Sequence, residues 1–245
     1  MSKLTWDSTG EHFYETGIEK CALFPITSGK YATGVAWNGI TSINENSSGG
    51  EITALYADNI KYLQMISPEE FAATVEAYAY PEEFKQCIGE LGWADGVVLS
   101  QQRRKHFGLV YRTLIGNDIY GSDLGYKLHI LFDCIAGPTA ESHSTITDSP
   151  EAMTFSWEIN TNKESVDDYL PTACVVMDSL QLKEVGLTNI LTYIEDMVYG
   201  SDSNDPTFMG VSDILDACTT QMYIMDLESD FILDSDGNYI QSSVY

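Results

Sequence analysis

The C-terminal segment Asp234-Ser235-Asp236-Gly237-Asn238 carries the oxygen-bearing side chains with which a calcium-binding loop begins. Such a loop has a bidentate glutamate at its twelfth position, where this chain has Tyr245. Asp-Gly-Asn is also a composition typical of tight turns, and the flanking residues alternate as the strands of a hairpin do. We therefore predict a hairpin turn and no metal site, and calcium binding at Asp234–Asn238 stays an open alternative.

Catalytic chemistry has no signature in the sequence: motifs for an activated serine, a histidine-bound zinc, a phosphate loop or a dinucleotide are absent. The four histidines are isolated from one another, at His12, His106, His129 and His143. That isolation favours surface or strand positions over metal ligation. Any two of the 37 acidic residues could meet as a glycosidase pair, which pattern alone does not exclude. We predict no catalytic residue and no cofactor.

Five cysteines are scattered singly along the chain, at Cys21, Cys87, Cys134, Cys174 and Cys218. Disulfide frameworks and metal sites need clustered spacings, and no C-x-x-C pair is present. We expect buried free thiols in a reducing compartment.

One basic cluster stands out, Arg103-Arg104-Lys105-His106, with Arg112 and Lys127 further along. Five of the twelve basic residues fall within these 25 positions. In an acidic chain such a cluster indicates contact with an acidic surface, for example that of a neighbouring copy at Arg103, Arg104 and Lys105. Strand-edge charges that prevent aggregation are an equally good explanation.

The chain around these residues has 245 positions and a formal net charge of −25, with 44% hydrophobic and 11% aromatic residues. That length suits one large β domain or a domain with extensions, and the aromatic content excludes a disordered acidic tail. Phosphate neutralisation cannot hold nucleic acid on so acidic a protein. No apolar stretch has the length of a signal or membrane segment, so we expect a soluble, unexported protein.

Period-two alternation predicts half-buried antiparallel strands. It is clearest in Gly125–Ile135, where only Leu131 is out of pattern, in Met153–Ile159 and around Phe107, Leu109 and Tyr111. A strand at Gly34–Trp37 is expected to kink at Asn38-Gly39 and to continue through Ile40–Ile43.

The polar run 44–50 is predicted as the flexible tip of an extended hairpin, with a second arm from Glu51 to about Ala57. Thr74–Tyr80 alternates as a strand, and Ser67-Pro68-Glu69-Glu70 before it predicts a short turn of helix. The best helix is Thr188–Tyr199, with Thr188 as its cap and Gly200 as its stop.

The last third changes composition: from Glu184 to Tyr245 there are twelve acidic residues and no Lys or Arg. We predict a main body over residues 1–200 and an acidic extension over 201–245. Within the extension we expect a linker at Ser201–Pro206, a short helix at Val211–Cys218 and a terminal hairpin.

Several long segments, in the same order, resemble the major tail tube protein of long non-contractile-tailed phages. They are Thr33–Ser42, Glu51–Tyr62, Glu76-Ala77-Tyr78, Tyr80–Phe84, Gly125–His129 and Asp148–Glu158. The resemblance covers roughly residues 3–200 and assigns no role to residues 201–245. Inner tubes of contractile injection systems and of type VI secretion share this architecture, but the matched segments favour the non-contractile phage.

The resemblance implies a mainly β fold of two packed antiparallel sheets, a tail-tube β-sandwich or barrel, with a flanking helix, a long hairpin loop and a C-terminal extension. It further implies hexameric rings stacked into a tube, the conduit for genome delivery, with the loop reaching the adjacent ring. The loop's best match here is the hairpin around Thr41–Asp58, and its candidate contact residues are Thr41, Glu45, Asn46, Glu51, Tyr56 and Asp58.

The expected partners are other copies of the chain and the tape-measure, tail terminator and tail-tip proteins, with DNA passing unbound. The expected location is the virion tail, assembled in the host bacterial cytoplasm. The alternative from another class is an acidic β-sandwich that binds calcium or carbohydrate or hydrolyses glycosides.

Overall fold

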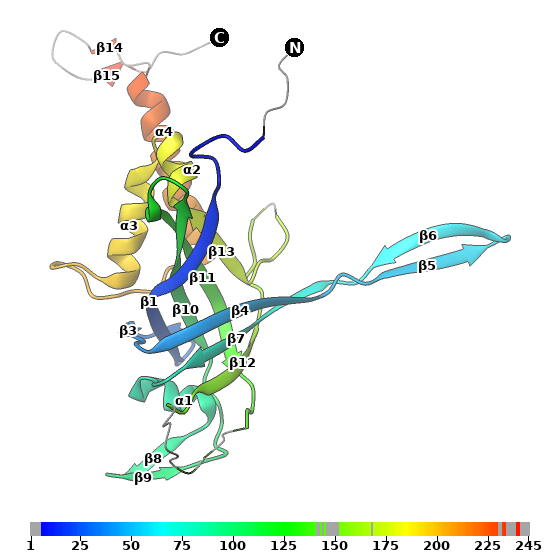
Figure 1. The fold of residues 1–245 in the computed structure, drawn as a ribbon, viewed down its shortest axis with the longest axis vertical. Coiled ribbons are helices and arrows are strands. Elements are labelled where there is room, and N and C mark those ends of the chain that lie inside the picture. Colours follow the sequence, from blue (N-terminus) through cyan, green and yellow to red (C-terminus); the bar gives the residue numbers. More distant parts are fainter. Residues whose placement is uncertain are drawn as a thin grey trace.

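Figure 1 shows the computed structural model, which describes residues 6–140, 143, 145, 152–167, 169–229, 232–233 and 239–240. Far more of the described residues lie in strands than in helices, so the predicted mainly β class is confirmed.

Most strands belong to a large antiparallel sheet, and three hairpins stand apart from it. The strands are β1 Tyr14–Thr27, β2 Lys30–Tyr31, β3 Val35–Ala36, β4 Ile40–Gly49, β5 Ile52–Ala57, β6 Ile60–Ile66, β7 Glu69–Ala77, β8 Leu91–Ala94, β9 Val97–Leu99, β10 Phe107–Asn117, β11 Gly121–Ala136, β12 Phe155–Thr161, β13 Cys174–Asp178, β14 Ile232–Leu233 and β15 Tyr239–Ile240. The helices are a 3₁₀ turn at Glu82–Phe84, α1 Lys85–Ile88, α2 Ser179–Glu184, α3 Thr188–Tyr199 and α4 Val211–Ser229.

The large sheet has the strand order β2-β1-β10-β11-β12-β7-β4, with β3 beside β1 and β13 beside β11. It forks at β11, whose middle residues pair with β13 and whose last residues pair with β12. The half formed by β12, β7 and β4 packs over the half formed by β1, β10 and β11. The two packed layers predicted from the sequence are therefore two halves of one hydrogen-bonded sheet.

Aromatic rings fill the core between the two halves. Trp37 lies 4.3 Å from Phe84 and 5.6 Å from Trp157, measured between ring centroids. Trp157 is 2% exposed, as expected for the apolar face of its half-buried strand. Buried edge-to-face rings of this kind stabilise a core beyond the area they remove from water.

A second core lies on the other face of β1, β10 and β11, beneath α3 and α4. This explains Leu131, which breaks the alternation of β11, because both faces of that strand are covered. Leu128 and Ile130 face the helices, and Leu131 faces the aromatic core. At Asp133 the backbone turns left-handed (φ 40°), and Cys134 after it belongs to the aromatic core and not to the face of Leu128.

Helix α3 has the predicted bounds, and its apolar stripe is buried at Ile190, Leu191, Ile194 and Val198. The predicted cap is wrong: Thr188 is the first helical residue, Leu187 precedes it, and no side chain caps the helix. Beyond α3, Phe208, Met209, Val211 and Ile214 join the second core, with Cys218 packed against it. The packed body therefore continues well past residue 200, where composition placed its end.

Three further expectations need correction or extension. The segment predicted as a helical turn, Ser67–Glu70, leads into β7, because its backbone pairs with β4 from Glu69 onward. Residues 44–49, predicted as a loop tip, are a strand on the other side of that pairing. The helix predicted over Val211–Cys218 runs to Ser229. The terminal hairpin is confirmed in its strands, β14 and β15, while its predicted turn at Asp234–Asn238 lies outside the described residues.

Candidate assembly surfaces

A long hairpin arm projects from the body, formed by β5 and β6 beyond the paired strands β4 and β7 (Figure 1). Its tip is Asp58-Asn59, and both residues have left-handed backbones, with φ of 50° and 61°. Two consecutive positive φ values define the type I′ turn, whose twist matches that of the flanking strands. The tip predicted at residues 44–50 therefore lies instead at Asp58-Asn59.

The arm exposes large apolar side chains at most positions of its two strands. Exposure ranges from 40% at Leu63 to 71% at Tyr56, and the full set is Ile52, Leu55, Tyr56, Ile60, Tyr62, Leu63, Met65 and Ile66. A two-stranded hairpin without a core is marginally stable in water. Large apolar side chains gathered in this way on a projecting element of a folded protein indicate a binding surface.

The two faces of the arm differ in charge. Opposed residues of an antiparallel pair share a face, so register places Leu55 with Leu63 and Thr53 with Met65 on one face. That face carries no charged residue and is completed by Ala57 and Ile60. The opposite face carries Ile52, Tyr56 and Ile66 together with Lys61, whose Nζ donates to Gln64 Oε1 at 2.7 Å. We call the uncharged side the apolar face of the arm.

The root of the arm is fastened to the body by Glu45, in β4. Its carboxylate accepts hydrogen bonds from the Tyr111 hydroxyl and from His129 Nδ1, the latter at 2.9 Å. His129 is 7% exposed and stacks on the Tyr111 ring at 4.7 Å. Its Nε2 lies 3.0 Å from Thr113 Oγ1, which itself donates to Glu15 at 2.5 Å. This polar cluster connects the arm's root to the long central hairpin.

Electrostatics keep the carboxylates of this cluster charged. The hydrogen bond from His129 lowers the pKa of Glu45 against the opposing effect of its burial, and Tyr111 adds to the lowering. Burial also raises the pKa of Glu15, but hydrogen bonds from Lys127 and Thr113 outweigh it and the net shift is downward. A glycosidase acid needs a raised pKa. With their pKa values lowered, Glu45 and Glu15 suit a structural role better than general acid catalysis.

The six residues predicted for the inter-ring loop divide between the arm and its root. Thr41, Glu45 and Asn46 lie in β4, and Glu51 follows it, its N–H donating to Ser67 Oγ at 2.9 Å. Tyr56 and Asp58 lie on the arm itself. Sequence reasoning missed the return strand β6, although the apolar content of Ile60–Ile66 was a usable signal.

The three residues of the predicted contact patch, Arg103, Arg104 and Lys105, line one depression but differ in what they contact. Arg104 donates to the carbonyl oxygens of Ala136 and Gly137 at 2.6 and 2.7 Å. Its guanidinium therefore stabilises the end of β11 and is engaged within the subunit. Arg103 is exposed, and Lys105 Nζ is 3.5 Å from Thr27 Oγ1. These residues line a depression of about 590 Å³ together with His106, which pairs with Asp133 at 2.6 Å.

Arg112 and Lys127 lie elsewhere. Arg112 is buried, pairs with Glu195 of α3 and sits 4.1 Å above the Tyr126 ring. Lys127 pairs with Glu15 at 2.6 Å. Only Arg103 and Lys105 of the predicted contact patch therefore remain available to a partner.

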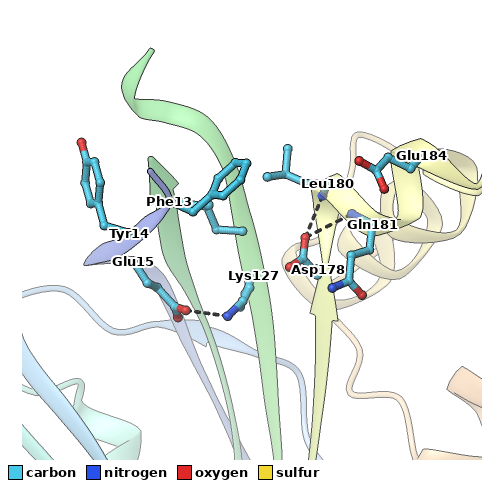
Figure 2. A pocket seen from close by; sticks show the side chains of 9 residues that line it. Phe13, Tyr14, Glu15, Lys127, Asp178, Leu180, Gln181 and Glu184 are labelled. Carbon is cyan, nitrogen blue, oxygen red and sulfur yellow. Dashed lines mark hydrogen bonds and ion pairs between the residues drawn. The ribbon is translucent and has the colours of Figure 1, made fainter. Parts of the chain in front are cut away.

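A hollow of about 420 Å³ lies between β1, β11 and α2. Phe13, Tyr14 and Leu180 border it, and the ion pair between Lys127 and Glu15 lies along one side (Figure 2). The Asp178 carboxylate is already engaged, because it caps α2 by accepting from the N–H groups of Leu180 and Gln181 at 2.9 and 3.2 Å. No group of metal-ligating side chains occurs among the described residues, this hollow included.

The cysteines are free thiols, as predicted. Burial raises the pKa of Cys21 and Cys134, and it raises that of Cys87 and Cys174 to about 12. A thiol held in its protonated form is a poor nucleophile and a poor metal ligand.

No family model and no curated protein matches this chain. Within the described residues, no helix combines the length and the apolar character needed to cross a membrane.

Proposed function

We propose that this protein is a structural subunit of a bacteriophage tail tube of the long non-contractile type. Copies assemble into hexameric rings, and the rings stack into the hollow tube that conducts the genome. Its other partners are the tape-measure, tail terminator and tail-tip proteins. Its place is the virion tail.

The observation that carries the proposal is the projecting arm. A hairpin with eight large exposed apolar residues, anchored at its root by Glu45, is costly for a protein that stays monomeric. Burial of its apolar face, which carries Leu55, Ile60, Leu63 and Met65, against a neighbouring subunit lowers that cost by about 25 cal/mol for each Å² covered. In the resemblance, the segment around Thr41–Asp58, which includes β5 of the arm, matches the loop that reaches the adjacent ring.

Two further features support assembly around a DNA channel. Strands β4 and β13 are edges of the large sheet, and pairing between subunits satisfies such edges. The net charge of −25 repels the phosphate backbone, so a wall built from this chain offers DNA no adhesive sites during passage.

The test compares arm variants by negative-stain electron microscopy and light scattering. Wild-type protein should form rings or tubes. Leu55→Asp/Leu63→Asp places two charges on the apolar face and should leave a folded monomer, with unchanged circular dichroism. The control Gln64→Asp, on the opposite face, should assemble. Normal assembly of the double variant, or a wild type that stays monomeric at high concentration, contradicts the proposal.

A further inference from the structure

The depression of about 590 Å³ beside Arg103 and Lys105 collects polar side chains from two distant parts of the chain. The segment before β10 supplies Arg103, Lys105 and His106, and the turn between β1 and β2 supplies Ser28. The two parts are joined where the Ile26 N–H donates to the His106 carbonyl at 2.7 Å. Sites for small molecules occupy about 300–1,000 Å³, so this depression has the size of a binding site.

The hydrogen-bond donors that line the depression are largely unused within the subunit. The side chains of Arg103 and Ser28 make no hydrogen bond or ion pair to the residues that the structure describes. Lys105 Nζ has a single contact, at 3.5 Å to a threonine hydroxyl. His106 donates from Nδ1 to Asp133, and its Nε2 has no partner in the described part of the chain. Three donor side chains are therefore available to a bound molecule, and protonated His106 adds a fourth.

The acceptor in the lining, Asp133, is already engaged. Its Oδ1 accepts from His106 Nδ1 at 2.6 Å, and its Oδ2 accepts from Asn162 Nδ2 at 2.8 Å. Its backbone is left-handed, with φ of 40°, and its N–H donates to the Tyr31 hydroxyl at 3.1 Å. A side chain in that conformation is held there by its contacts, and such strain concentrates at functional sites. The depression is thus rich in donors and poor in unused acceptors.

The charge inside the depression favours an anion, although this end of the protein as a whole is not cationic. The acidic residues nearby do not line it: Glu82, Glu83, Glu90 and Asp95. The lining holds three permanent cations against one carboxylate, because Arg104 keeps its charge while it donates to two carbonyl oxygens. Coulomb energy falls with distance and salt screens remote charges, so the lining residues act most strongly on a bound ion.

We propose that this depression binds a tetrahedral oxyanion, either inorganic phosphate or the phosphate group of a small molecule. Arg103 and Lys105 supply the charge-assisted hydrogen bonds that phosphate oxygens accept. Ser28 and His106 complete the set. A phosphate group has three acceptor oxygens and a charge of about −1.5 to −2 at pH 7, whereas a carboxylate has two oxygens and one charge. Binding at this depression does not depend on assembly into a tube.

Equilibrium dialysis of the full-length protein against radiolabelled inorganic phosphate tests the site. Salt at about 0.15 M screens the net charge of −25, which would otherwise exclude phosphate from the protein compartment. We expect saturable binding at one site per chain. Arg103→Gln/Lys105→Gln should weaken it at least about tenfold, because two charge-assisted hydrogen bonds are lost, with unchanged circular dichroism. Ser28→Gly removes the hydroxyl where φ is 54°, a conformation that suits glycine, and should weaken binding about two- to tenfold.

The control Lys20→Gln/Lys183→Gln removes two exposed cations that do not line the depression, and should bind phosphate as wild type does. Unlabelled AMP and glycerol 3-phosphate then compete with the labelled phosphate. Stronger displacement by either than by inorganic phosphate identifies a phosphorylated small molecule as the ligand; otherwise the ligand is free phosphate.

Absence of saturable binding at millimolar phosphate overturns the proposal, and so do equal losses in the control. If Arg103→Gln/Lys105→Gln fails to assemble but binds phosphate as wild type does, the surface contacts an acidic second copy instead. The proposed function is unaffected by a failure to bind phosphate.

Discussion

A charged side chain buried in the second core needs compensating contacts from its neighbours. Arg112 is the clearest case, because it is 7% exposed and projects from β10 toward α3. It pairs with Glu195, lies 3.6 Å from Glu19, and has the rings of Tyr126 and Tyr199 beside its guanidinium at 4.1 and 5.4 Å. Removing one partner of a buried pair leaves the other charge unpaired, which costs far more than the pair contributes.

Arg112→Met should therefore lower the free energy of unfolding by about 3–5 kcal/mol, because the Glu195 carboxylate loses its cation in a site that is 17% exposed. The matched change Lys127→Met breaks a more exposed pair with Glu15 and should cost about 0–1 kcal/mol. Urea titration of the monomer measures both. The double variant Arg112→Met/Glu195→Gln should regain part of the loss, and equal losses in all three variants would contradict this reasoning.

Glu45 should make stability depend on pH. Its pKa is lower in the folded protein than in the unfolded chain, so its stabilisation is complete above the unfolded value and is lost as pH falls through the folded value. Glu45→Gln should thus cost about 1–2 kcal/mol at pH 7, a typical value for hydrogen bonds to a charged group that keeps some exposure. The difference from wild type should shrink toward pH 3 in urea titrations. Glu51→Gln, at the exposed base of the arm, is the control; a pH-independent cost for Glu45→Gln would refute the assignment.

At the scale of elements, the central strands β1, β10 and β11 have a hydrophobic core on each face. The segment after α3 packs on the face that α3 also covers. Phe208 is 7% exposed and lies 4.0 Å from the Tyr31 ring and 5.1 Å from the Phe24 ring. It packs directly over Gly108, where a Cβ would come within 2.4 Å of its ring. The segment that follows α3 is therefore part of the second core.

Phe208→Ala should lower the free energy of unfolding by about 3–5 kcal/mol, as for other buried aromatics. Phe13→Ala, at a residue 61% exposed, should change it by less than about 1 kcal/mol. Deletion of residues 201–245 should consequently unfold the body, which calorimetry would report as loss of the unfolding transition. A stable protein ending at residue 200 would show that the second core does not need this segment.

The whole molecule combines strong self-repulsion with several projecting apolar parts. A charge of −25 on every copy opposes association, while the arm and β8–β9 favour it. The repulsion acts over the Debye length, which falls from about 30 Å in 0.01 M salt to about 8 Å in 0.15 M salt. Close contacts between copies are screened much less.

Assembly should therefore increase as salt rises from about 0.01 to 0.15 M, since screening removes long-range repulsion before it weakens contact pairs. Light scattering at fixed protein concentration measures this. A steady fall of assembly with salt would mean that ion pairs, and not apolar contacts, dominate association.

Local periodicity and composition were enough to predict several strands, one helix and the net charge of this protein. Alternation predicted the strands at Gly125–Ile135 and Met153–Ile159, and the apolar stripe predicted α3 with its bounds. These predictions succeed because side-chain period depends only on backbone geometry, which neighbouring residues set. Charge likewise follows from composition, and with it the expectation that the chain does not hold nucleic acid by neutralising its phosphates.

Tertiary structure decided everything that depends on distant partners. Ser67–Glu70 has the local pattern of a helix start, but the backbone there leads into pairing with β4. Glu45 meets His129, 84 positions away, and the buried phenol of Tyr111, so no spacing in the sequence reveals that anchor. The projection of the arm and the packing of Phe208 are decided in the same way. Burial and hydrogen-bond satisfaction depend on which surfaces meet in three dimensions, and sequence neighbours do not contain that information.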